Sequence, residues 1–123
     1  MAKRPAAGKE VRVCPRLRVM WGREIALGPG RVELLELIGQ TGSLRAAALK
    51  MGVSYMRAWN LVKDTNRCFS EPLVEATRGG RTGGGARLTE AGWEVVAKYR
   101  EMENKSQKAI SDTWTGIKSR LKK

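Results

Sequence analysis

The chain has 123 residues, which is enough for one domain with a modest hydrophobic core and too few for a large second domain. Its 24 lysines and arginines outnumber its 12 acidic residues, and because histidine is absent the net charge is +12. This excess favours a polyanionic partner, with nucleic acid as the first candidate and an anionic membrane surface as the second.

The sequence carries no segment typical of secretion or of a membrane span. No apolar run approaches the roughly 18 residues of a transmembrane helix, and no apolar signal segment follows Met1. Cys14 and Cys68 are far apart and have no companion histidines, which is neither a metal-ligand spacing nor a disulfide framework. We therefore expect a cytoplasmic protein with two free thiols, no metal and no cofactor.

The first 15 residues are polar and basic, and Pro5 and Gly8 interrupt them. We expect residues 1–15 to form a flexible arm, either simply solvated or adding contacts to phosphates. An alternating pattern follows, which predicts a β-hairpin that turns at Trp21 and Gly22. In its first strand, one face would carry Leu17, Val19 and Trp21.

Helical spacing replaces this alternation after Gly-Pro-Gly at residues 28–30. From Arg31 onward apolar residues recur at the intervals of an α-helix, and Gly39 and Gly42 bracket its end. Residues 43–68 then carry the pattern of a helix-turn-helix. Ser43 is expected to cap a short helix at residues 44–51, and Ser54 a second one from Tyr55 to about Cys68.

The turn between these two helices has a steric rationale. Gly52 accepts a positive φ, and Ala47 and Ala48 are small enough to let two helices cross closely. On the second helix, spacings of three and four place one stripe against the core. This stripe consists of Ala58, Leu61, Val62, Thr65 and Phe69.

The opposite face of the second helix is predicted to be polar and basic and to carry no carboxylate, with Asp64 off its edge. At 100° per residue it carries Met56, Asn60, Lys63 and Arg67. Residues 54–57 form the first turn, where a recognition helix usually meets base edges and where free N–H groups favour phosphate. The alternative is an amphipathic helix whose solvated face happens to be basic. Trp59 lies to one side, and we expect it to be half-buried in packing rather than to contact a base.

Residues 78–87 form a glycine-rich basic loop between two strand-like runs, PLVEAT and ARLT. A nucleotide-binding phosphate loop needs Gly-Lys-Ser/Thr leading into a helix, which is absent here. A plain flexible hairpin tip remains the alternative. The glycines let the backbone approach a partner closely, and the loop brings three positive charges from Arg78, Arg81 and Arg87. The pattern predicts a β-wing that lays arginines along a phosphate backbone or in a minor groove.

Thr89 and Glu90 open the last helix, which is predicted to run to about Leu121. An early stripe of Val95, Tyr99 and Met102 gives way to a later seam at spacings of four, three and four, typical of a short coiled coil. This seam consists of Ile110, Trp114, Ile117 and Leu121. Because the stripe shifts near residues 104–107, we expect a kink or break there. An exposed seam favours homodimerisation, and a helix folded back on its own hairpin is the alternative.

Three stretches together resemble the N-terminal DNA-binding domain of ModE-type regulators, a winged helix-turn-helix related to that of LysR-type regulators. They read LGPGRVELLELIGQTGSLRAAA, GVSYMRAWNLVKDTNRCF and PLVEATRGGRTGGGARLTEAG, and the likeness covers about residues 16–100. The resemblance implies a dimer that grips a palindromic operator with its recognition helices in the major groove. Residues 54–57 would begin the recognition helix, and residues 78–87 would form the wing.

ModE-type proteins of full architecture continue into domains that bind molybdate or tungstate. This chain stops at Lys123, so oxyanion sensing is not carried over and no small-molecule effector site is expected in it. The basic ending KSRLKK favours a natural stand-alone regulator over a fragment.

The predicted fold is mainly α (α+β): a winged helix-turn-helix at residues 16–100, with an N-terminal β-hairpin and a β-wing, followed by a long C-terminal dimerisation helix at 101–123. The predicted function is sequence-specific transcriptional regulation of molybdate- or tungstate-related genes through double-stranded DNA. The alternative is a non-specific DNA-architectural protein. The expected DNA-binding residues are Ser43, Arg45, Ser54, Tyr55, Met56, Arg57, Asn60, Lys63, Arg78, Arg81 and Arg87.

Catalysis is disfavoured by the residues that are present. The chain has no histidine, its cysteines have no base partner, and no carboxylate pair lies in an apolar stretch. A peripheral membrane protein is also disfavoured, because the basic residues follow a helix-turn-helix and wing rather than one amphipathic face.

Overall fold

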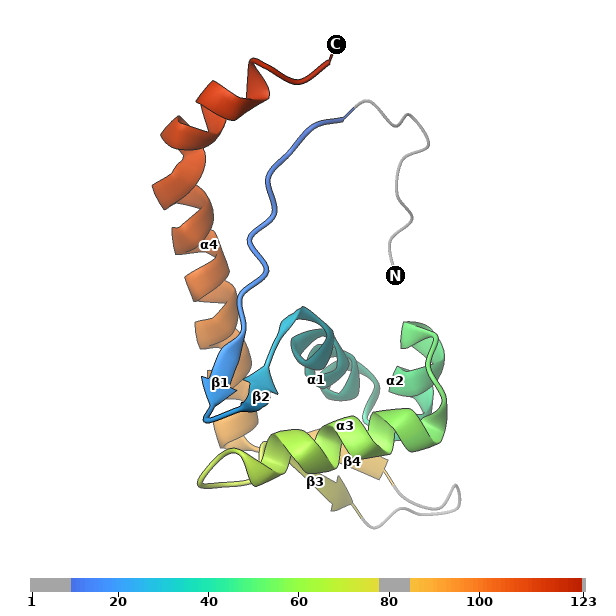
Figure 1. Cartoon of the computed structure of the whole chain (residues 1–123). Helices are drawn as coiled ribbons and strands as arrows, with labels where there is room; N and C mark the ends of the chain where they lie inside the picture. The colour runs from blue at the N-terminus through green and yellow to red at the C-terminus, as the bar shows by residue number, and fades with distance from the viewer. Residues whose placement is uncertain (1–9, 78–84, 123) are drawn as a thin grey trace.

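The computed structural model describes residues 10–77 and 85–122 (Figure 1). The described part begins with a β-hairpin, continues through three helices and a second hairpin, and finishes in one long helix. This order confirms the predicted winged helix-turn-helix. Its elements are β1 (Val19–Trp21), β2 (Glu24–Leu27), α1 (Pro29–Thr41), α2 (Leu44–Met51), α3 (Tyr55–Arg67), β3 (Val74–Thr77), β4 (Gly85–Leu88) and α4 (Glu90–Lys118).

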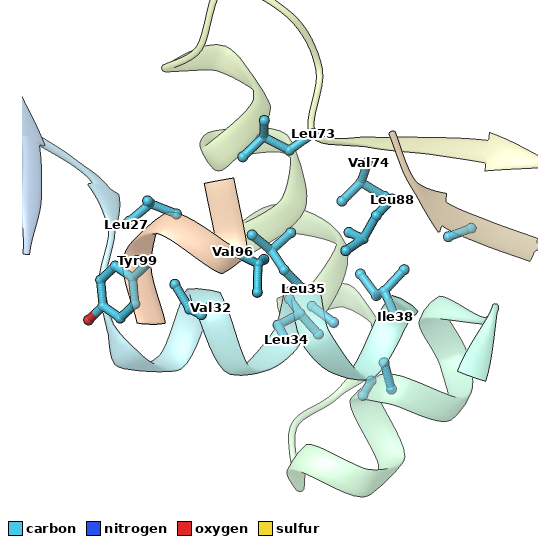
Figure 2. Close-up of a cluster of buried hydrophobic side chains, with 14 residues drawn as sticks. Leu27, Val32, Leu34, Leu35, Ile38, Leu73, Val74, Leu88, Val96 and Tyr99 are labelled. Atoms are coloured by element: carbon cyan, nitrogen blue, oxygen red, sulfur yellow. The ribbon is translucent and has the colours of Figure 1, made fainter. Parts of the chain in front are cut away.

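Helix α1 is the centre of the hydrophobic core, and it packs against α2, α3, α4 and strands of both hairpins. Its Val32 and Ile38 are fully buried, and Leu34 and Leu35 are nearly so. Figure 2 shows these side chains meeting Leu73 and Leu88 from the second hairpin and Val96 and Tyr99 from α4. Burying an aliphatic side chain of this size contributes roughly 1.5–3 kcal/mol, so α1 is the framework on which the other helices are placed.

The N-terminal hairpin forms as predicted but its alternation is interrupted. Strands β1 and β2 are antiparallel, and their register shifts between Val19 and Met20. Leu17 and Val19 pack against the core, whereas Trp21 is 56% exposed. Trp21 therefore does not join the core with them; it lies at the end of β1 next to the turn, and the extra residue at the bulge is Ala26 of β2.

Helix α4 is continuous from Glu90 to Lys118, so the predicted break near residues 104–107 is wrong. That stretch contains neither glycine nor proline, and nothing in its backbone chemistry forces a break. The stripe shifts there because the first half of α4 packs on the domain, whereas the second half extends beyond it (Figure 1). The helix also ends earlier than predicted, which leaves Leu121 after its last turn.

The segment before β1 runs beside α4 in the opposite direction (Figure 1). The Tyr99 hydroxyl donates to the Leu17 carbonyl at 2.7 Å, and the Gln107 amide donates to the Val13 carbonyl at 3.0 Å. Eight helical residues span about 12 Å and four extended residues about 13 Å, so the two bonds fit a straight antiparallel alignment. Residues 10–15 of the predicted arm thus lie along α4, and residues 1–9 are outside the described part.

Candidate nucleic-acid interface

The helix-turn-helix forms with the predicted bounds and caps. The hydroxyl of Ser43 accepts from the Ala46 amide, and that of Ser54 from the Arg57 amide, each at 3.0 Å. Gly52 has a φ of 81°, and its N–H donates to the carbonyl of Ala48 at 2.9 Å. This left-handed conformation favours glycine and closes α2 directly before α3 begins.

Small residues bring α2 and α3 close to α1. Ala47 and Ala58 are fully buried, and Ala48 is 2% exposed. Thr65 is the buried polar residue of α3, and its hydroxyl accepts a 3.4 Å hydrogen bond from Arg31 of α1. The predicted core stripe of α3 is therefore confirmed, with the partly buried Leu61, Val62 and Phe69 completing it.

The remaining surface of α3 is exposed. Met56 is 61% and Tyr55 43% exposed, and the structure places five of the predicted DNA-binding side chains of α3 in solvent. These are Tyr55, Met56, Arg57, Asn60 and Lys63. The first turn of α3 also presents backbone N–H groups that have no intrahelical partner, which favours phosphate.

The far end of this face differs from the prediction. Arg67 donates to Glu24 of β2 at 2.6 Å and to Asp64 at 3.0 Å, so a carboxylate from another element reaches the face. The hydrogen bond to Glu24, followed by that to Asp64, raises the pKa of the Arg67 guanidinium. The expectation of a face free of carboxylates is wrong at this position, and Arg67 links α3 to the N-terminal hairpin.

At the start of α2, the two predicted residues have different surroundings. Ser43 is half-buried and its hydroxyl serves as the helix cap. Arg45 is exposed, and its guanidinium carbon lies 5.0 Å from the centre of the Tyr55 ring on α3. The structure thus brings Arg45 and Tyr55 together across the turn.

The second hairpin supplies the base of the wing. Glu75 of β3 lies opposite Arg87 of β4, and the Arg87 guanidinium donates to its carboxylate at 2.7 and 2.9 Å. Arg87 is exposed but paired, whereas Arg78 and Arg81 fall outside the described residues. Of the predicted wing arginines, the structure thus describes Arg87, which pairs with Glu75.

Asn66 holds this hairpin against α3, a role that the sequence analysis missed. Its side-chain oxygen accepts from the Leu73 and Val74 amides at 2.8 and 3.2 Å, and its amide donates to the Val74 carbonyl at 3.0 Å. The only available signal was an asparagine near the end of a helix that precedes a strand. These three bonds fix the position of the start of β3 relative to α3.

Close backbone approaches hold the hairpin at two further points. The Ala86 amide donates to the Gly42 carbonyl at 3.2 Å, and a Cβ on Gly85 would lie 2.8 Å from that carbonyl oxygen. A Cβ on Gly92, in the first turn of α4, would lie 2.3 Å from the Leu73 carbonyl oxygen. The Thr89 hydroxyl, which caps α4, donates to the Pro72 carbonyl at 2.8 Å. The Leu-Thr-Glu-Ala-Gly stretch therefore needs its threonine and its glycine for this junction.

A groove of about 440 Å³ separates the helix-turn-helix from the wing strands. Arg45, Tyr55, Trp59 and Lys63 lie along its helical side, and Glu75 and Gly85 are among its wing residues. Trp59 is 41% exposed, and the Lys63 ammonium nitrogen lies 4.5 Å from the centre of its ring. Trp59 thus faces the groove, next to a cation.

The described residues contain neither a metal-binding cluster nor a membrane-spanning helix. Over residues 10–77 and 85–122, no cluster of cysteine and acidic side chains could hold a metal ion. The helices within those ranges include none with the length and apolar character required to cross a bilayer.

The predicted dimerisation residues lie along the second half of α4 and just after it. Ile110 and Trp114 are half-buried, Ile117 is 59% exposed, and Leu121 is 43% exposed beyond the end of the helix. A smaller apolar hollow of about 230 Å³ lies against the first half of α4, between Val95, Tyr99 and Met102 and the hairpin residues Val19 and Leu27. The described chain covers neither surface completely.

A capped helix pair with an exposed second helix, joined to a two-stranded wing, defines the winged helix-turn-helix class. Comparison with known proteins gives the same class and also assigns the chain to a particular family within it. The bacterial regulatory helix-turn-helix proteins of the lysR family match residues 30–93, from α1 to the first turn of α4. The chain belongs to this family.

Its relatives include proteins with molybdenum in their names. The molybdenum-pterin-binding protein MopA of Rhodobacter capsulatus is 43% identical over 91 residues, which are 74% of this chain and 34% of MopA. MopB of the same organism is 40% identical over 111 residues, or 90% of this chain and 41% of MopB. The DNA-binding transcriptional dual regulator ModE of Escherichia coli K12 is 37% identical over 82 residues, or 67% of this chain and 31% of ModE. The chain therefore spans between about a third and two fifths of the length of these relatives.

Proposed function

We propose that the chain is a transcriptional regulator that binds a palindromic operator as a homodimer, with α3 of each subunit in the major groove. The observation that carries this proposal is the position of strands β3 and β4, the base of the proposed wing, where three hydrogen bonds from Asn66 hold the start of β3 against α3. A recognition helix and a wing held in one rigid unit can contact a major groove and the adjacent backbone together.

The side chains of α3 suit different parts of such an interface. Asn60 can pair through the oxygen and the NH2 of its side-chain amide with an adenine edge, and Met56 can contact a thymine methyl group. Arg57 and the free amides of the first turn, next to the capping Ser54, suit phosphates. Arg87, together with Arg78 and Arg81, is proposed for the wing contact, and Arg45 and Lys63 for the backbone.

Dimerisation is proposed to use the second half of α4. Ile110, Trp114 and Ile117 follow one stripe of the helix, and most of the Ile117 surface is exposed. A second copy of the same stripe would cover it and would relate two recognition helices by a two-fold axis, as a palindrome requires. Residues 101–123 are thus the proposed dimerisation region.

Genes of molybdenum or tungsten metabolism are the proposed targets. This proposal rests on relatives named for molybdenum-pterin binding and for DNA-binding regulation. We assign oxyanion binding to none of the described residues, so molybdate and tungstate are expected to leave the melting temperature of the chain unchanged. A saturable rise in melting temperature would contradict this assignment.

The proposed function is tested by DNA titration. Genomic fragments retained by the protein are sequenced, and the shared palindrome is then titrated against random duplex at two salt concentrations. We expect preferential binding to the palindrome, with log K falling by about 7 per unit of log salt if the dimer neutralises roughly eight phosphates. An affinity ratio near one at both salt concentrations would favour the DNA-architectural alternative instead.

A further inference from the structure

The groove between α3 and the wing has positive charge at fixed positions. Tyr55, Trp59 and Lys63 follow one another at four-residue intervals on α3, and all three line the groove. This row spans about 12 Å along the helix. Arg45 stacks on the ring at one end of the row, 5.0 Å from its centre, and Lys63 stacks on Trp59 at 4.5 Å.

The two stacked cations are not neutralised by the opposite wall. Glu75 is the carboxylate among the described lining residues, and Arg87 already holds it at 2.7 Å. The remaining wing residues of the wall include Ala76, Gly85 and Ala86, whose small side chains leave the groove open. The described walls therefore combine a positive charge balance with room for a narrow ligand.

We propose that this groove seats the sugar–phosphate backbone of one DNA strand, and that Tyr55 and Trp59 are positioning residues for the cations that bind it. The proposal rests on the proposed DNA-binding function and assigns these residues within it. Arg45 and Lys63 are the phosphate contacts. The two rings limit the conformations of these long side chains before DNA arrives, so less rotamer entropy is lost on binding.

The arrangement favours backbone over base contact for Trp59. Asn60, which is proposed to read bases, lies about 100° around α3 from Trp59, which faces the wing. Because the Asn66 bonds fix the hairpin to the same helix, the two walls hold a constant separation. A constant width suits the regular backbone of a duplex, which is the same for every sequence.

The test is a double-mutant cycle between Trp59→Leu and Lys63→Gln, measured as affinity for the operator and for random duplex over a range of salt. Trp59→Leu should weaken both DNAs by the same factor, about two- to fivefold per subunit. Lys63→Gln should reduce the salt slope by about 0.9 per subunit. In the Lys63→Gln background, Trp59→Leu should cause no further loss, because the ring acts through the lysine.

Three control variants separate positioning from a merely structural role. Trp59→Phe keeps an aromatic face and should recover most of the affinity lost in Trp59→Leu. Trp93→Leu removes an exposed tryptophan from α4, away from the groove, and should leave the salt slope unchanged. Thermal unfolding of each variant shows whether the fold is intact. If Trp59→Leu is unfolded, the affinities of Trp59→Phe and Trp59→Met are compared instead, to test whether the aromatic ring is required for DNA binding.

Other outcomes would overturn the inference. A loss from Trp59→Leu that persists in the Lys63→Gln background would mean that the ring contacts DNA directly rather than through Lys63. A changed ratio of operator to random affinity would make that contact one with a base. Competition by inorganic phosphate at constant ionic strength, abolished by Lys63→Gln, would mean that the groove takes a free anion. If operator preference is intact but Trp59→Leu has no effect, this inference alone fails. If wild type shows no operator preference, the regulator function fails, while the cycle on random duplex still decides the role of Trp59.

Discussion

The two halves of α4 belong to one unbroken helix but have different surroundings. In the first half, Gly92 lies against a backbone carbonyl, Val96 and Tyr99 are buried, and Arg100 pairs with Glu36 of α1 at 2.6 Å. From residue 104 to the end of the helix no residue is fully buried by the described chain. A regular helical backbone therefore does not show whether a helix is packed. The first half of α4 is held by the domain, whereas the second half has an apolar stripe that the described chain leaves uncovered.

The largest expected effect tests whether the second half of α4 packs against a second copy of the chain. Trp114→Glu should place an unpaired charge in the proposed interface and weaken dimerisation by about 3–5 kcal/mol. Palindrome binding would fall with it, because single helix-turn-helix domains would then bind separately. Sedimentation over a concentration series measures the change. Thr115→Glu adds the same charge about 100° away on the same helix and should leave the dimer intact; equal loss in both variants would contradict the assigned seam.

Two glycines of α4 give a direct comparison of its halves. Gly92→Ala should destabilise the fold by about 3 kcal/mol, because the new Cβ would lie 2.3 Å from the Leu73 carbonyl oxygen. Gly116→Ala, which meets nothing within 4 Å, should instead stabilise by up to about 1 kcal/mol through helix propensity. Denaturant unfolding measures both. If both substitutions change the free energy of unfolding in the same direction, the two halves of α4 do not differ in packing as described.

The ion pairs of α4 also differ between its first half and its second half. Arg100 bonds to Glu36 and Glu103, and these hydrogen bonds raise its pKa, so it stays charged over the whole working range. Arg100→Gln should cost about 1 kcal/mol, since its side chain is 38% exposed and water screens the pair. Lys105→Gln removes a more exposed pair with Glu101 and should cost less stability than Arg100→Gln. If Arg100→Gln lowered the free energy of unfolding equally at high and low salt, the ion pair of Arg100 would not be screened by solvent.

The last comparison concerns the dependence of stability on pH. Burial, followed by the Glu103 carboxylate, raises the pKa of the Tyr99 hydroxyl above its ordinary value of 10.0. The stability that this gives is fully present below pH 10, where the unfolded phenol is also neutral, and is lost as pH rises through the folded pKa. Tyr99→Phe also loses the hydrogen bond to Leu17, at about 1 kcal/mol, and should flatten the alkaline decline of the melting temperature. Tyr55→Phe, in the exposed tyrosine, should keep that decline.

The sequence by itself determined the local elements of the protein. The caps at Ser43, Ser54 and Thr89 and the turn at Gly52 lie where the pattern placed them. Such signals act over three or four residues, through hydrogen bonds and steric limits that the chain carries wherever it folds. The helix-turn-helix and the strands of the wing base were predictable for this reason.

Only the tertiary structure decided which of these elements meet. Arg67 and Glu24 are 43 residues apart, and Tyr99 and Leu17 are 82 apart. Asn66 became a wing anchor, and Trp59 came to face a groove, through packing around α1 rather than through their own neighbours in sequence. Long-range pairing depends on how all the buried surfaces fit at once, so a pattern of a few residues determines each helix but not the surface that the helices form together.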